Sequence, residues 1–241
     1  MLCSLPEICC ETAFRNFDQC KILHPPNKCN PISWFDSHLI EHQNLVHPNW
    51  EQVYKQANNL EAKNDPNELW CDIARTWMSH LVDRLTDKYT RTESDNFILI
   101  SVHNYSFNES LLIFLERTRK RLLKKGTGIL NDDGFGKYVV IAFADTDSYY
   151  DYVSYFGPQE GVFGMSSGMF INGGYGHFVF FESRLDEVEQ IAAHEMTHAL
   201  LDHLPIPLWL NEGMAVSLES VITGVATVSY THLTLPTILL V

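Results

Sequence analysis

Apolar residues between positions 50 and 85 recur at spacings of three and four, the period of a helix that buries one face. One run begins at Trp50 and ends near Leu60, and a second follows the polar break NDPN and ends at Leu85. The apolar positions of the second run are Leu69, Trp70, Ile73, Ala74, Trp77, Met78, Leu81, Val82 and Leu85. This pattern predicts two amphipathic helices whose aromatic stripes face a protein core.

The middle of the chain alternates strand-like and helical patterns. Residues 97–102 (FILISV) and 138–144 (YVVIAFA) are short apolar runs bounded by polar residues, which is typical of buried strands. A helical period covers residues 109–125 between them, and a short helix is expected over 147–156. A glycine-rich stretch, 157–176, then leads into FVFF, a further strand that begins at Phe178. The order predicts an α+β fold with a small mixed sheet packed on helices.

Two more helices are expected near the end of the chain. Ser183 followed by Asp186 has the form of a capping box and predicts a helix over residues 184–203. A proline-containing connection ends this helix, and helical spacing resumes over residues 209–218, with Pro207 near the first turn. The short connection should bring the two helices together.

Composition and charge narrow the class of protein. A net charge of −13 without a long basic stripe argues against a nucleic-acid partner, and the basic residues 117–125 fit the cationic last turns of a helix. We find neither a signal-peptide pattern nor an apolar run of membrane-spanning length, so we expect a cytoplasmic protein with reduced thiols. All cysteines except Cys71 lie in the first 29 residues. A zinc knot of Cys20, His24 and Cys29 is not favoured, because no CxxC pair supports it.

The segment AAHEMTHAL contains the pattern HExxH, from His194 to His198. Residues four apart on a helix share a face, so both imidazoles can reach one ion, with Glu195 on the adjoining side. Zinc binds imidazole nitrogen, and a catalytic zinc site uses three protein ligands and leaves the fourth position for water. We therefore expect Zn²⁺ to be bound by His194, His198 and a third residue.

Three residues are candidates for the third ligand. Asp202 could orient the imidazole of His198, but it also fits a solvated helix end, and His203 fits a helix-terminal cation. Glu212, in the segment PLWLNEGMA on the returning helix, could complete a set of two histidines and one glutamate. The metzincin pattern is excluded, because it needs a glycine and a histidine where this chain has leucines.

The segment HEMTHALLDHLPIPLWLNEGMA resembles the core of the peptidase MA-like gluzincins, which pair HExxH with a downstream glutamate in a WLNEG motif. The resemblance covers roughly residues 50–222 and is strongest over 188–219. It implies a zincin-like, thermolysin-like catalytic half with an HExxH active-site helix, preceded by a helical segment, and hydrolysis of peptide bonds at zinc. Thermolysin has an acidic residue four positions after its ligand glutamate, where this chain has Val216. The side chain that supports a ligand histidine there is thus not identified.

The expected mechanism follows from the charges. Zinc would acidify a bound water and polarise the scissile carbonyl, and Glu195 would take the proton as general base and deliver it to the leaving amine. No oxyanion donor can be assigned. Tyr175 and His177 are candidates for lining the cleft, although an ordinary role in a hairpin fits them better. The strand near Phe178 is a candidate for pairing with an extended peptide or protein substrate.

We divide the chain into an irregular Cys/Pro-rich extension (1–46), a helical segment (47–92) and a zincin-like catalytic domain (93–227). The segment VSYTHLTLPT can be encoded by a transposase sequencing adapter, so we expect residues 228–241 to be a scar on a truncated gene and do not consider His232 a ligand. Two other functions share the same residues: a catalytically inactive zincin-like binding module, and a zinc hydrolase of a non-peptide bond. The sequence does not indicate an oligomeric state.

Overall fold

A computed structural model describes residues 32–61, 65–86, 88–132, 134–157, 167–181 and 184–225. Three predictions lie outside these ranges: the cysteine-rich start with its zinc knot, the Ser183 capping residue, and the 228–241 scar with His232. The α+β prediction is confirmed, because helices pack on a five-stranded mixed sheet and a two-stranded hairpin lies beside them.

The larger sheet has the strand order β3-β4-β5-β7-β6. Its strands are β3 (Thr90–Glu93), β4 (Phe97–Ser101), β5 (Tyr138–Ala142), β6 (Gly168–Ile171) and β7 (His177–Phe180). The central strands β4, β5 and β7 are parallel, and β3 and β6 pair antiparallel at the two edges. The predicted runs at 97–102 and 138–144 are the first two central strands.

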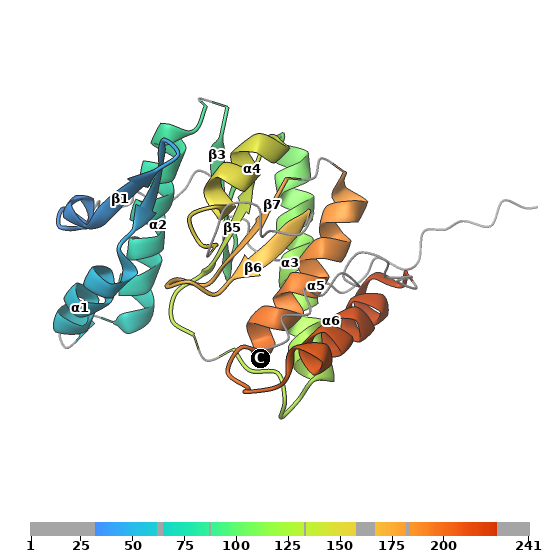
Figure 1. Ribbon diagram of the computed structural model, residues 1–241. Helices are drawn as coiled ribbons and strands as arrows, with labels where there is room; N and C mark the ends of the chain where they lie inside the picture. Colours follow the sequence, from blue (N-terminus) through green and yellow to red (C-terminus); the bar gives the residue numbers. More distant parts are fainter. Residues whose placement is uncertain are drawn as a thin grey trace, which may run out of the picture.

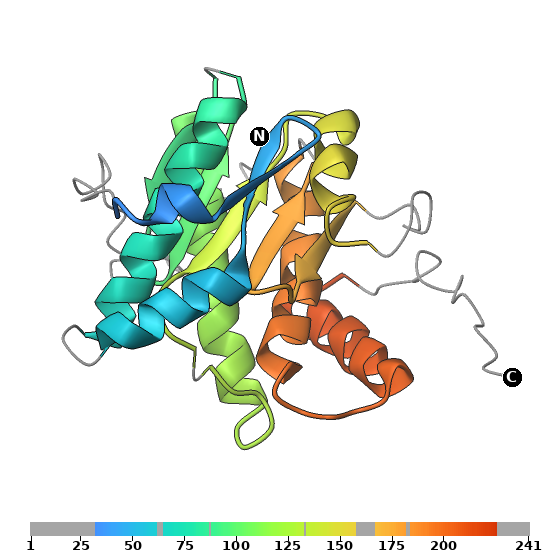
Figure 2. The ribbon, with the colours of Figure 1, turned by 60° about the vertical axis from the view of Figure 1, so that its left-hand side comes forward.

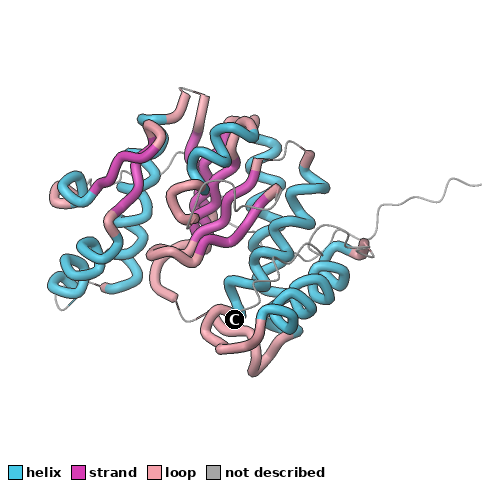
Figure 3. The backbone as a smooth tube through the Cα atoms, viewed as in Figure 1, coloured by secondary structure: helices cyan, strands magenta, loops and turns pink. Residues whose placement is uncertain are grey.

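Helices cover both faces of this sheet, so that three layers result (Figure 1, Figure 3). Alternate residues of a strand point to opposite faces. In β4, Ile98 and Ile100 join the core formed with α2 (Pro66–Arg84) and α4 (Thr146–Val153). Phe97 and Leu99 join the core formed with α3 (Tyr105–Lys125) and α5 (Leu185–Leu201). Burial on both faces explains why these strands read as unbroken apolar runs.

The N-terminal part contains strands as well as the expected helices. After η1 (Phe35–His38), β1 (Leu39–His42) and β2 (Leu45–Pro48) form a hairpin that lies across the boundary we place at residue 46. Its turn residues Gln43 and Asn44 both have positive φ, 49° and 61°, as a two-residue hairpin turn requires. Helix α1 (Trp50–Glu61) follows, and Figure 2 shows it in front of the sheet.

Helices α5 and α6 (Leu208–Thr223) form an antiparallel pair that makes the most extensive contact between elements of the fold (Figure 2). Arg184 precedes α5 without a side-chain cap hydrogen bond, and Pro207 is the N-cap of α6. Within the described ranges, no helix has the length and apolar character to span a bilayer.

Candidate metal centre

The α5–α6 pair brings the predicted ligands together. His194 and His198 lie one turn apart on α5, and Glu212 faces them from the first turns of α6. The Nε2 atom of His194 is 3.5 Å from one carboxylate oxygen of Glu212, and Nε2 of His198 is 3.6 Å from the other. Ligand atoms around a tetrahedral zinc ion, each about 2.0–2.2 Å from the metal, lie about 3.3–3.6 Å apart. The two distances from the histidines to Glu212 therefore lie in the range found between ligand atoms of a tetrahedral zinc ion.

The outer nitrogen of each imidazole, which is Nδ1, has a polar partner on α6. His194 Nδ1 is 3.1 Å from Oε2 of Glu219, and His198 Nδ1 is 2.8 Å from Oδ1 of Asn211. With a metal ion bound, a proton on each Nδ1 would be donated to these oxygens, and the Nε2 lone pairs would be left for the ion. Histidines that bind metals are usually held in this way.

Neither Asn211 nor Glu219 was identified from the sequence. Glu219 lies seven residues after Glu212, two turns along the same helix face. The thermolysin pattern has its acidic residue only four positions after the glutamate, where this chain has Val216. Asn211 directly precedes Glu212 in the WLNEG segment. Asp202, which we considered as the partner of His198, instead accepts a hydrogen bond from the amide of Asn172.

The third acidic residue of the site, Glu195, is almost fully buried, with 8% of its surface exposed. Its carboxylate Oε2 accepts the backbone N–H of Phe170 in β6 at 2.7 Å. Ligand atoms of Glu195, His194 and His198 all lie within 4.8 Å of one another. Glu195 is tied to the strand, whereas Glu212 faces both Nε2 atoms, so Glu212 is the better placed of the two to share a metal ion with the histidines.

The electrostatics of this cluster favour a cation. Glu195, Glu212 and Glu219 place three carboxylates around two imidazoles in a site that is mostly closed to solvent. Burial raises the pKa of Glu195 to about 7, against the pull of His194. For His194, burial opposes the charged form, but the contacts with Glu212 and Glu219 outweigh it and raise the pKa to about 9. A divalent cation between the side chains would compensate this excess of negative charge.

One expectation about a neighbouring segment needs correction, and the hairpin role favoured for His177 is confirmed, because this residue lies in β7, which pairs with β6. The strand at Phe178 is not an edge strand, because β7 pairs with β5 on one side and β6 on the other, so that the edge next to Glu195 is β6. His177 does not line a cleft. It is fully buried, and its ring contacts the hydroxyl of Tyr152 at 2.8 Å and the carbonyl of Tyr175 at 2.7 Å.

The remaining candidates border a cavity of about 650 Å³ beside the site. Tyr175 lines it from the β6–β7 turn, and Asp202 and His203 line it from the end of α5. Comparisons of the chain with protein-family models, with curated proteins and with solved structures find no match.

Proposed function

We propose that this protein is a zinc-dependent peptidase with a zincin-like catalytic domain, in which α5 is the active-site helix. The observation that supports this most strongly is the convergence of two Nε2 atoms and the Glu212 carboxylate at 3.5–3.6 Å, with both outer nitrogens held by α6. His194, His198 and Glu212 would hold the zinc ion. Bound zinc supplies an acidified water and polarises a carbonyl group.

Glu195 is the proposed general base. Its hydrogen bond to Phe170 fixes the orientation of the carboxylate beside the metal position. A carboxylate held in this position can accept a proton from water and then deliver it to a leaving amine.

The edge strand explains why we propose a peptide or protein as substrate. β6 is the edge of the sheet on the side of Glu195, and Phe170 in this strand contacts the proposed base. An extended peptide can add to such an edge through main-chain hydrogen bonds other than the one from the Phe170 N–H, which Glu195 accepts, and this would bring its amide carbonyl groups close to the metal position.

The test combines metal content with turnover. Purified full-length protein should contain one zinc ion per chain and cleave a mixed peptide library. Glu195→Gln should retain zinc and lose cleavage, since Gln keeps the shape of the side chain but cannot accept the proton. The His198→Ala variant should lose both the zinc ion and peptide cleavage.

Each alternative has its own result. Retained zinc without cleavage of any peptide would support a non-catalytic binding module. Zinc-dependent hydrolysis of esters or other acyl compounds without peptide cleavage would support a hydrolase of a non-peptide bond. A parent protein free of zinc after metal-supplemented purification would contradict the metal centre itself.

A further inference from the structure

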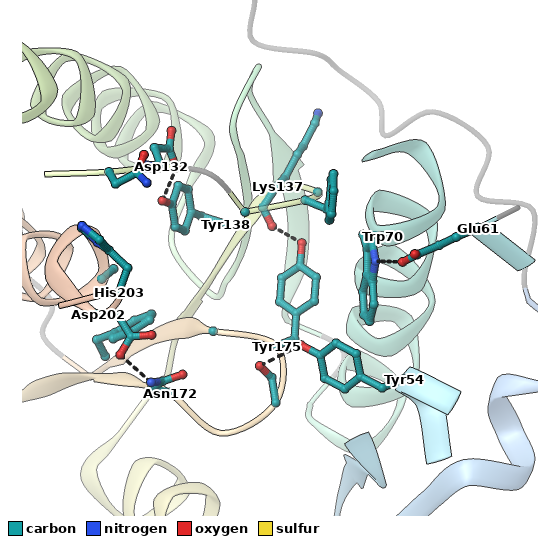
Figure 4. Close-up of a pocket in the computed structure, with 18 of the residues that line it drawn as sticks. Tyr54, Glu61, Trp70, Asp132, Lys137, Tyr138, Asn172, Tyr175, Asp202 and His203 are labelled. Carbon is teal, nitrogen blue, oxygen red and sulfur yellow. Dashed lines mark hydrogen bonds between the residues drawn. The ribbon is translucent and has the colours of Figure 1, made fainter. Parts of the chain in front are cut away.

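The cavity of about 650 Å³ has the size of a ligand pocket and lies outside the metal centre. It opens between the N-terminal helices and the C-terminal end of α5 (Figure 4). Its walls come from α1, α2, the segment before β5, the end of β6 with the following turn, and α5. Helix α1 and the last turn of α5 are far apart in sequence and form opposite walls.

The cavity adjoins the proposed active site at two residues. Phe170 lines the cavity, and its backbone N–H donates a hydrogen bond to Glu195. Ala199 also lines it and directly follows His198. Positions 195, 199 and 202 lie on one face of α5, so the face that carries the proposed base continues into the cavity wall.

Aromatic rings make up much of the wall. Tyr54 and Trp70 are in contact, with ring centroids 4.8 Å apart, and Trp70 and Tyr175 are 6.1 Å apart. Tyr175 is fixed by a hydrogen bond from its hydroxyl to the carbonyl of Lys137. Figure 4 shows Tyr54 and Tyr175 between the Trp70 side of the cavity and the Asp202 side. Of these rings Tyr54 is the exposed one, at 41%, and its face can stack on a guanidinium group.

The charges at the cavity are predominantly negative. Glu61 accepts the indole N–H of Trp70 at 3.0 Å, and Asp202 accepts from the Asn172 amide, so both carboxylates bind neutral donors. Asp132, the third acid, pairs with Arg119. Lys137 also lines the cavity, but its ammonium group binds Glu93 at 3.2 Å and the carbonyl of Ser94 at 2.7 Å, and neither of these residues is part of the cavity wall.

We propose that this cavity binds a basic residue of the substrate, with arginine as its best occupant. This inference rests on the proposed peptidase function, which makes a peptide the substrate. Strand β6 runs toward the cavity and ends at Ile171, just before Asn172 in the wall. A peptide paired antiparallel with β6 therefore reaches the cavity with the residues on the N-terminal side of the scissile bond.

The test uses two acetylated, amidated hexapeptides of alanine that carry either arginine or citrulline at the third position. Citrulline keeps the shape of arginine and removes its charge. Binding is measured by calorimetry on the full chain with Glu195→Gln, so that no turnover is needed. The arginine peptide should bind about tenfold more tightly than the citrulline peptide, and this ratio should fall to about one when Glu61→Gln and Asp202→Asn are added.

The matched control adds Glu51→Gln and Asp186→Asn instead. These acids lie on the same two helices, pair with Lys55 and Arg184 at the surface, and are not part of the cavity wall, so the ratio should stay near ten. Equal binding of the two peptides would overturn the inference, as would a preference that survives the loss of Glu61 and Asp202 charges. A preference for arginine in a protein that cleaves no peptide would support the cavity assignment and contradict only the peptidase function.

Discussion

Replacing Glu219 by Gln removes the charge beside His194 Nδ1 and leaves the size of the side chain almost unchanged. The two atoms are 3.1 Å apart, and both side chains are at most 8% exposed, so solvent screens their interaction little. A hydrogen bond to a charged group contributes about 1.5–3 kcal/mol, and Gln still offers a neutral acceptor, so we expect a loss near the lower end. This corresponds to zinc binding that is about 10-fold weaker.

Zinc affinity can be measured by competition with a chromophoric chelator of known affinity. Glu187→Gln is the matched control, because Glu187 pairs with Arg184 at the start of α5 and lies outside the metal centre. Circular dichroism of both metal-free variants verifies that the fold is retained. Zinc binding by Glu219→Gln that is as tight as in the parent would refute the positioning role, and so would an equal loss in the control.

Three further predictions concern stability. Adding zinc to the metal-free protein should raise its unfolding temperature, and His198→Ala should abolish the shift, because a ligand that binds only the folded state stabilises it. Gly174→Ala should destabilise the fold by about 3 kcal/mol or more in urea unfolding, because φ is 76° there and a Cβ would meet the Trp50 ring at 2.0 Å. Gly128→Ala, at φ 84° in open space, should cost only about 1 kcal/mol. Equal effects of the two alanines would contradict this reasoning. Burial lowers the pKa of His177 to about 4, below the unfolded value of 6.5. The stability that neutral His177 contributes is therefore complete above about pH 6.5 and is lost as the pH falls toward 4, by at most about 3 kcal/mol. The pH profile of urea unfolding should be flatter in His177→Gln, and parallel profiles would contradict the assignment.

The long helices could be predicted because each buries one continuous face. Helix α2 was expected from its apolar period, and α3 was expected from residue 109 but begins at Tyr105. Its start is fixed by Asn104, whose side chain accepts the N–H of Phe107. Such a cap leaves no trace in the apolar period, so the boundary was four residues late.

The short edge elements could not be predicted from the pattern of apolar residues. Strand β3 is four residues long and polar, TRTE, and it exists because β4 supplies its hydrogen-bonding partner. The β1–β2 hairpin likewise depends on packing against α2, and its sequence contains no Asn-Gly or Asp-Gly turn. Tertiary contacts decide these segments, and the local sequence carries little of that information.

In the candidate site, too, local geometry could be predicted and tertiary arrangement could not. His194, Glu195 and His198 belong to one helix turn, so their mutual placement follows from helix geometry alone. The edge strand depends on sheet order, and the prediction for Phe178 was wrong because β6 lies beyond β7 in the described sheet. The cavity beside the site could not have been predicted, since its walls come from five separate parts of the chain.

The support for His194 shows why a fixed motif spacing missed Glu219. Along an α-helix each residue turns by about 100°, so position 219 lies about 20° from the direction of Glu212, whereas position 216 lies about 40° away on the other side. Since α5 and α6 are antiparallel, a step of one turn back from His198 to His194 on α5 matches a step forward on α6. His198 therefore meets Asn211, and His194 meets a residue further along, Glu219. The crossing of the two helices decides which position can reach the outer nitrogen. An acidic residue seven positions after the proposed ligand Glu212 can therefore provide the contact for which a spacing of four was expected.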